Sequence, residues 1–231
     1  MTLFKKTLTE KLEALSLQYD ETVIKNCAAY YELVVEANKH QNLTRITDEA
    51  QAAEQHFADA MALCAAIELP HGCRMIDIGT GAGFPGVPLK LLRPDIELTL
   101  LDASGKKTDF IKSVLAKMDV QATVLCGRAE ELGRGPQREG FDVAVSRAVA
   151  PMPMLLELAV PMLKAGGTLA AWKGETFAQE MRDAASALDA LACGQTGSFA
   201  VGRGAILLIQ KQKPTPDIYP RRFSKMKSMP L

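Results

Sequence analysis

The sequence predicts an α/β fold: a doubly wound, mostly parallel sheet with one antiparallel strand and an N-terminal helical extension. From residue 74 on, short apolar runs alternate with segments of helical spacing, the order typical of a parallel sheet covered by helices. A glycine-rich turn follows the first apolar run, as in a strand–turn–helix unit. Two last apolar runs face each other across Gly202-Arg203-Gly204, which indicates a hairpin and hence the antiparallel strand.

Three parts of the chain are expected, in order. Residues 1–70 should form the helical extension packed on the core, since apolar residues recur at helical spacing before and after a polar connection. Residues 71–211 should form the core, and residues 212–231 a basic, proline-rich tail. Helical spacing covers 3–37, 49–68, 86–92, 105–117, 152–163 and 176–191, and strands are expected at 74–78, 97–101, 120–126, 141–146, 168–172, 194–201 and 205–210.

The C-terminal tail differs from the rest of the chain in charge and proline content. Its four prolines oppose regular structure, so an extended basic strap suited to phosphate contacts is one interpretation and a merely solvated tail is the other. The basic residues are Lys211, Lys213, Arg221, Arg222, Lys225 and Lys227, against the single acid Asp217.

Composition narrows the function classes. The formal net charge is zero, so the chain as a whole has no electrostatic attraction to nucleic acid, and DNA is not an expected partner. The five cysteines form no C-x-x-C pair, and the histidines have no metal-like spacing, which indicates reduced thiols and no metal site. No apolar run approaches the length of a membrane span, and no secretory segment is visible, so we expect a cytoplasmic protein without a membrane partner.

The glycine-rich turn reads Asp-x-Gly-x-Gly-x-Gly from Asp77 to Gly83 and indicates a nucleoside-containing cofactor. Asp102 follows 19 residues after Gly83, past a second apolar run, where a carboxylate can accept hydrogen bonds from both ribose hydroxyls. A dinucleotide fingerprint would need glycine at the position of Phe84. Pro85 removes an N–H that a pyrophosphate would use. The loop therefore favours a cofactor without phosphate, and its spacing resembles motif I of S-adenosylmethionine-dependent methyltransferases.

Motifs outside this loop carry a more specific resemblance, collinear from about residue 38 to the C-terminus. Together they resemble the bacterial 16S rRNA (guanine-N7)-methyltransferase family, also called glucose-inhibited division protein B. The motifs are Asn42-Leu43-Thr44, His56-Phe57-Ala58-Asp59, Ile76 to Gly86, Leu101-Asp102-Ala103, Gly127-Arg128-Ala129-Glu130-Glu131, Ser146-Arg147-Ala148, Trp172-Lys173-Gly174, Tyr219-Pro220-Arg221-Arg222 and Pro230-Leu231.

The resemblance implies a Rossmann-like class I methyltransferase with S-adenosylmethionine as donor and S-adenosylhomocysteine as product. It implies a guanine in a decoding-region loop of 16S rRNA as acceptor, within the 30S subunit or an assembly precursor. Glu130 has a second interpretation as a helix-capping or solvated acid. The expected cofactor contacts are Gly79, Phe84, Ala129, Glu130 and Arg147 by the resemblance, with Gly81, Gly83 and the ribose-binding Asp102 from the residues themselves.

Guanine N7 carries a lone pair and no proton, so its methylation needs positioning and no general base. Arg147 and Asn42 are the positioning candidates, although Arg147 could be an ordinary ion-paired arginine and Asn42 a turn cap. His56 is expected to be structural. A small-molecule methyltransferase of the same fold remains an alternative, as does an RNA-binding module without activity. Candidate RNA contacts are Arg45, Lys173, Arg221 and Arg222, with a solvated strand-end lysine as the other interpretation of Lys173.

Overall fold

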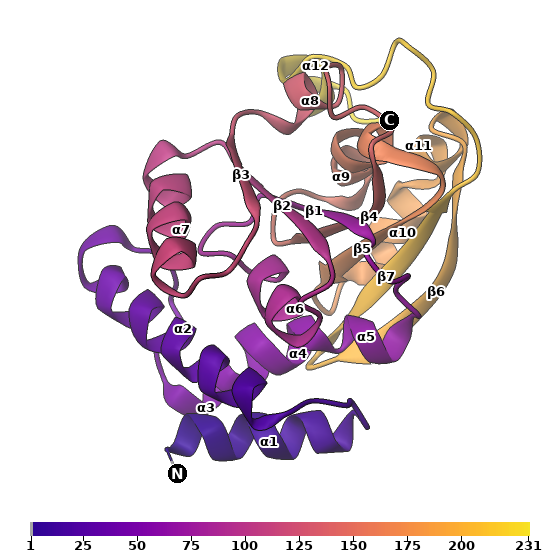
Figure 1. Cartoon of the computed structure of the whole chain (residues 1–231). Helices are drawn as coiled ribbons and strands as arrows, with labels where there is room; N and C mark the ends of the chain where they lie inside the picture. The colour runs from indigo at the N-terminus through magenta and orange to yellow at the C-terminus, as the bar shows by residue number, and fades with distance from the viewer. Residues whose placement is uncertain (1) are drawn as a thin grey trace.

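A seven-stranded sheet forms the centre of the molecule in the computed structural model, which describes residues 2–231. The strand order is β3-β2-β1-β4-β5-β7-β6 (Figure 1). β7 runs antiparallel to both of its neighbours, whereas the pairings among β1 to β5 are parallel. The predicted sheet with one antiparallel strand is therefore confirmed. The strands are β1 Arg74–Ile78, β2 Glu97–Asp102, β3 Thr123–Cys126, β4 Phe141–Arg147, β5 Leu163–Lys173, β6 Cys193–Val201 and β7 Gly204–Lys211.

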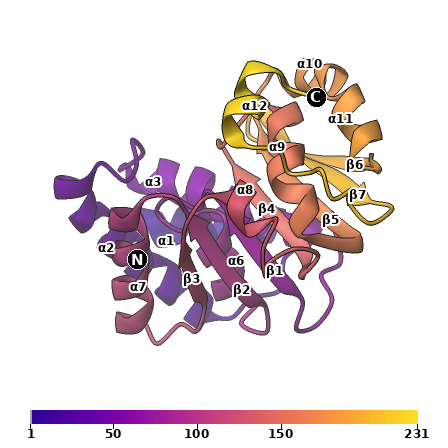
Figure 2. The same ribbon diagram turned by 90° about the horizontal axis from the view of Figure 1, so that it is seen from above.

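Helices cover both faces of this sheet (Figure 2). One hydrophobic cluster contains Met75 of β1 together with residues of the N-terminal helices, α6 and α7. The other contains Ile76 and Ile78 of β1 together with residues of α9 and α11. No helix within residues 2–231 is long and apolar enough to cross a membrane. The helices are α1 Leu3–Ala14, α2 Glu21–Gln41, α3 Glu49–Ala52, η1 Ala53–Ala58, α4 Asp59–Met61, α5 Leu63–Ala66, α6 Gly86–Leu92, α7 Gly105–Lys117, α8 Ala129–Leu132, α9 Met152–Ala159, η2 Val160–Met162, α10 Phe177–Asp183, α11 Ala185–Ala190 and α12 Phe223–Ser228.

The helical spacing expected over residues 3–37 belongs to two helices, α1 and α2. Ser16 adopts a positive φ of 55° after α1, and the Asp20 side chain accepts a hydrogen bond from the Val23 N–H at the start of α2. The conformation of Ser16 ends α1, and the Asp20 cap begins α2. Neither residue is apolar, so the apolar periodicity did not reveal the break.

The helical segment expected at 49–68 is present up to Ala66 but contains a π-helical stretch, η1. There the Asp59 N–H donates to the carbonyl oxygen of Glu54, five residues earlier. A π turn shifts the following side chains around the helix axis, and such turns often occur at functional sites. Here η1 contains His56, which lies in the site described below.

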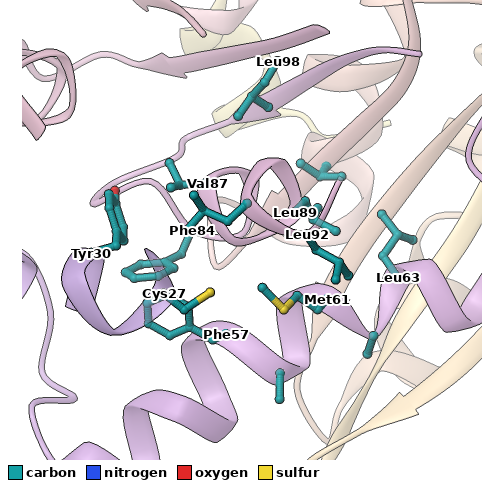
Figure 3. Close-up of a cluster of buried hydrophobic side chains, with 14 of the residues drawn as sticks. Cys27, Tyr30, Phe57, Met61, Leu63, Phe84, Val87, Leu89, Leu92 and Leu98 are labelled. Carbon is teal, nitrogen blue, oxygen red and sulfur yellow. The ribbon is translucent and has the colours of Figure 1, made fainter. Parts of the chain in front are cut away.

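Aromatic and aliphatic side chains join the N-terminal helices to the glycine-rich turn (Figure 3). Tyr30 of α2 and Phe57 of η1 both meet the ring of Phe84 edge-on, with centroid distances of 5.8 and 5.4 Å. The Tyr30 hydroxyl also donates to the Ala82 carbonyl oxygen at 2.6 Å. The helical extension therefore packs directly against the turn that follows β1.

Several predicted boundaries were wrong by a few residues. β3 begins at Thr123 and not at 120, because Asp119 takes a positive φ of 52° and the Val120 N–H donates back to Leu115 as α7 ends. The helix expected at 176–191 is divided at Ala184 into α10 and α11. The helix expected at 152–163 ends earlier, with a 3₁₀ turn, and β5 extends well beyond the expected 168–172.

The tail is not wholly irregular, which corrects the expectation drawn from its prolines. The stretch between Pro220 and Pro230 contains no proline and holds the short helix α12, whose Met226 is fully buried. Arg138 donates to the carbonyl oxygens of Thr215 and Tyr219, at 2.6 and 2.8 Å. These contacts fix the tail against the core.

Candidate active site

Two cavities lie side by side where the parallel strands end. The smaller, about 200 Å³, borders Asp102, and the larger, about 850 Å³, borders Arg147. Gly79 and Val149 line both cavities. Ligands of open α/β sheets bind at this edge, so the two cavities together form the candidate active site.

The three glycines of the turn have different roles. All adopt positive φ, at 69° for Gly79, 60° for Gly81 and 90° for Gly83. A Cβ on Gly79 would lie 2.3 Å from Val149 Cγ2, so this glycine lets the two segments meet between the cavities. A Cβ on Gly83 would lie 2.2 Å from the Tyr30 hydroxyl. Gly83 lines neither cavity, and its lack of a side chain serves the packing of the turn against α2.

Asp102 ends β2 at the mouth of the smaller cavity and is mostly buried. Its Oδ2 accepts from the Gly81 N–H and its Oδ1 from the Ser104 N–H, both at 2.9 Å. Because a carboxylate oxygen can accept more than one hydrogen bond, acceptor capacity remains for two ribose hydroxyls. The neighbouring wall is apolar, with Leu101 and Met154, which suits a purine. The carboxylate acceptor and the apolar wall therefore fit a nucleoside cofactor.

Ala129 and Glu130 begin α8 and line the smaller cavity, as their expected cofactor role requires. Glu130 is mostly buried, and its Oε1 accepts from Arg128 Nε at 3.0 Å. Both residues therefore border the same cavity as Asp102. Contact with the cofactor itself stays a prediction.

Asp77 is a residue whose importance the motif alone did not show. Its Oδ2 accepts from the Thr80 hydroxyl at 2.7 Å and from the Gly86 N–H at 2.8 Å, so it ties together both ends of the turn. Its Oδ1 has no partner. Complete burial raises the pKa of Asp77 to about 6, against the opposing effect of these hydrogen bonds. The sequence signal that could have identified Asp77 is an acidic residue within an otherwise apolar, buried strand.

Arg147, the last residue of β4, is held by the hydrogen bonds that it donates to η1. Its Nη1 donates to the Gln55 carbonyl oxygen at 2.6 Å, and its Nη2 donates to His56 Nδ1 at 3.0 Å. Since arginine can only donate, Nδ1 is unprotonated, and Nε2–H donates to Thr44 Oγ1 at 2.8 Å. Burial, assisted by the charge of Arg147, lowers the pKa of His56 to about 3. His56 is thus a neutral, hydrogen-bonding residue.

Phe84 lines the larger cavity but is mostly buried. The His56 ring stacks on it at 4.4 Å, and the Arg147 guanidinium carbon lies 5.6 Å from its centroid. Phe84 therefore positions the network around Arg147. Its predicted packing beside the sulfonium group stays a prediction.

The loop after α2 contributes Arg45 to the larger cavity, and Arg45 is exposed there. Asn38 holds this loop, because its side chain accepts from the Thr44 N–H at 2.9 Å and donates to the Thr44 carbonyl at 3.0 Å. Asn42 is exposed, does not line the cavity and ends α2 in a left-handed conformation with φ of 50°. Of its two expected roles, this geometry fits the cap.

Lys173 ends β5 and lines the larger cavity, but its charge is already paired. Its Nζ donates to Glu180 Oε2 at 2.7 Å and to the Ala150 carbonyl oxygen at 2.6 Å. The side chain is only 8% exposed. In this arrangement Lys173 fastens the loop after β4 to α10, and a phosphate would have to compete with these partners.

The two tail arginines named as RNA contacts lie in different surroundings. Arg221 forms a two-pronged ion pair with Glu157 of α9, with side chains 13% and 1% exposed. Arg222 is exposed. The sequence pattern could not separate them, because the buried Glu157 lies 64 residues away. Among residues 2–231, no cluster of His, Cys, Asp or Glu side chains could hold a metal ion.

Comparison with known proteins identifies the family. The family model GidB, described as rRNA small subunit methyltransferase G, matches residues 23–200. The chain belongs to this family. The relative from Moorella thermoacetica, named ribosomal RNA small subunit methyltransferase G, is 41% identical over 88% of each chain. A relative of the same name from Desulfitobacterium hafniense is 38% identical over 95% of this chain and 94% of its own. The family assignment confirms S-adenosylmethionine as the cofactor.

Solved structures agree with the fold. A SAM-dependent methyltransferase from Aquifex aeolicus superposes with a TM-score of 0.54 at 16% identity, covering 71% of this chain and 93% of that chain. A ribosomal protein L11 methylase from Lactobacillus delbrueckii superposes with a TM-score of 0.53 at 18% identity, covering 69% and 79%. The predicted Rossmann-like class I architecture is confirmed.

Proposed function

We propose that this protein transfers a methyl group from S-adenosylmethionine to N7 of a guanine in a decoding-region loop of 16S rRNA. The observation that supports this most directly is the larger cavity, about 850 Å³, which lies next to the nucleoside-sized cavity and is bordered by Arg45 and Arg147. A base that enters this cavity comes close to Gly79, one of the residues that line both cavities. The acceptor and the donor are thereby brought together.

The cofactor is expected to extend from one cavity to the other. Asp102 would hold its ribose, the apolar wall its purine, and the backbone around Gly79 its amino-acid portion. When bound, S-adenosylmethionine supplies a methyl group already activated by the sulfonium. The protein's remaining task is to align the acceptor and exclude competing water.

Arg147 is suited to orient a guanine. Arginine carries five N–H donors, and its hydrogen bonds to Gln55 and His56 use two of them. The others are available for the O6 acceptor beside N7, the edge that arginine reads in nucleic acids. Neutral His56 keeps the guanidinium in place and need not remove a proton, since N7 has none.

The substrate would be the rRNA within a 30S subunit or an assembly precursor, in the cytoplasm. A base must be unstacked or already splayed out to reach such a cavity. Arg45 at the cavity rim and Arg222 on the tail are exposed cations for the surrounding phosphates.

A methyl-transfer assay with several acceptors tests the proposal. Tritium-labelled S-adenosylmethionine is incubated with 30S subunits, naked 16S rRNA and a panel of small molecules. We expect label in 16S rRNA, at a guanine that becomes sensitive to borohydride reduction and aniline cleavage, the reactivity of N7-methylguanine. Label at another position would refute the N7 assignment, and label only in small molecules would favour the alternative methyltransferase.

The variant Asp102→Ala tests cofactor binding. Losing the two charge-assisted hydrogen bonds expected from the ribose hydroxyls should raise the dissociation constant for S-adenosylmethionine by about tenfold or more. Isothermal titration calorimetry measures this without RNA. Unchanged affinity would remove Asp102 from the ribose site.

A further inference from the structure

The smaller cavity has a wall that comes from the tail. Phe223, the first residue of α12, lines this cavity together with Asp102 and Glu130. Phe223 is 37% exposed, so its ring is not part of the closed hydrophobic core. The family model matches only residues 23–200, so nothing in that match covers Phe223.

The Phe223 ring is held in place by Arg128. The guanidinium carbon of Arg128 lies 4.2 Å from the ring centroid, a cation–π contact. Arg128 also donates to Glu130, and both residues line the same cavity. Phe223 thus belongs to a connected wall formed with the start of α8. Figures 1 and 2 show α12 lying over this end of the sheet, near α8 and α9.

The tail is anchored firmly enough to keep this ring in position. Arg221, two residues before Phe223, pairs with the buried carboxylate of Glu157. Arg134 Nε donates to the Pro220 carbonyl oxygen at 2.6 Å. On the other side of Phe223, Met226 is fully buried. Ordered contacts therefore flank the ring before and after it in the chain.

We propose that Phe223 is a cofactor-binding residue, which contacts the purine of S-adenosylmethionine and closes the adenine end of the cavity. The geometry supports this because Phe223 and Asp102, the residue expected to hold the ribose, line the same 200 Å³ space. A flat aromatic ring beside a purine gains dispersion and stacking energy. The inference rests on the family's cofactor and is independent of the RNA acceptor.

Binding measured without RNA tests the inference. Calorimetric titrations with S-adenosylhomocysteine and with 5′-methylthioadenosine compare the native protein with Phe223→Ala, Phe223→Tyr and Phe223→Leu. Base–aromatic stacking corresponds to roughly 5- to 150-fold in affinity, and a half-exposed ring should lie at the low end. We expect Phe223→Ala to weaken both ligands by about 5- to 10-fold, and by the same factor, since both contain the purine.

Two comparisons separate purine contact from simple tail docking. Phe223→Tyr keeps the ring and should retain native affinity, whereas Phe223→Leu keeps apolar bulk without a ring and should resemble Phe223→Ala. Ile218→Ala is the matched control, because Ile218 is a tail residue, 70% exposed, that does not line the cavity. Unchanged affinity in Phe223→Ala, native affinity in Phe223→Leu, or weakening confined to S-adenosylhomocysteine would each overturn the proposal.

Discussion

Replacing Asp77 by Asn should change how the stability of the protein depends on pH. Asp77 is completely buried, and its Oδ2 accepts both hydrogen bonds that hold the glycine turn, from Thr80 and Gly86. The asparagine carbonyl can accept the same two bonds. Its amide nitrogen would replace Oδ1, which has no partner in the native protein. The pH-dependent change is therefore the loss of a titrating charge.

The magnitude follows from the raised pKa. Burial raises the pKa of Asp77 from 3.8 to about 6, a shift of roughly two units. One unit corresponds to about 1.4 kcal/mol, so the effect is about 3 kcal/mol. A raised carboxyl pKa means that the folded state holds the proton more tightly than the unfolded chain. Its stabilisation is thus fully present below pH 3.8 and is lost as pH rises through 6.

Urea denaturation at constant ionic strength, at several pH values from 4 to 7.5, measures this effect. Fluorescence of Trp172, the single tryptophan, reports unfolding because that side chain is mostly buried. Other groups also titrate in this range. His56 is one, since its lowered pKa removes stability as pH falls below 6.5. They are common to both proteins, so the difference between native and Asp77→Asn isolates Asp77.

Relative to Asp77→Asn, the native protein should lose about 2–3 kcal/mol of unfolding free energy between pH 4 and pH 7. Parallel curves for the two proteins would show that the pKa of Asp77 is ordinary. If the unfolding free energy of the native protein instead rises relative to that of Asp77→Asn as pH increases, the pKa of Asp77 is lowered. Either result would refute the role assigned to burial.

Three further predictions concern the turn, the tail and the active site. Gly83→Ala should destabilise the protein by about 2–4 kcal/mol more than Gly81→Ala in urea denaturation, because only the former places a Cβ against Tyr30; equal losses would contradict this packing. Arg221→Ala should cost about 3 kcal/mol by leaving a buried carboxylate unpaired. Arg222→Ala should leave the melting temperature within a degree or two and weaken rRNA binding in filter assays; a large fall in its stability would refute this division of roles. The methylation rate should show no inflection near pH 6.5 from His56, whose pKa is about 3; an inflection that disappears in His56→Gln would contradict the neutral imidazole.

Much of the fold could be predicted because the relevant signals are local. The apolar run before Gly79 and the glycines themselves specify a strand and a turn, whatever the rest of the chain does. The hairpin at Gly202 is equally local. The boundaries were less predictable, because a positive φ at Asp119 ended α7 within a stretch whose apolar residues suited a strand. Hydrophobic periodicity does not register such single-residue conformations.

The candidate site was predictable in position but not in its contacts. Asp102 and Arg147 were expected at strand ends and are found there. The pairing of Lys173 with Glu180, and the role of Gly83 in packing against α2, were not expected. Both depend on segments that meet only after the helices pack on the sheet.

The sequence by itself determined the order of the strands and of the main helical segments, the nucleoside-type turn and the family, because these reside in local periodicity and in motifs. The tertiary structure decided which side chains meet. His56 and Arg147 are 91 residues apart in the chain and share a hydrogen bond. Phe223 lines the cavity from a tail that is fixed near α9 by a buried ion pair and by other contacts with the core. Contacts at such separations come from how whole elements pack, and no local pattern specifies them.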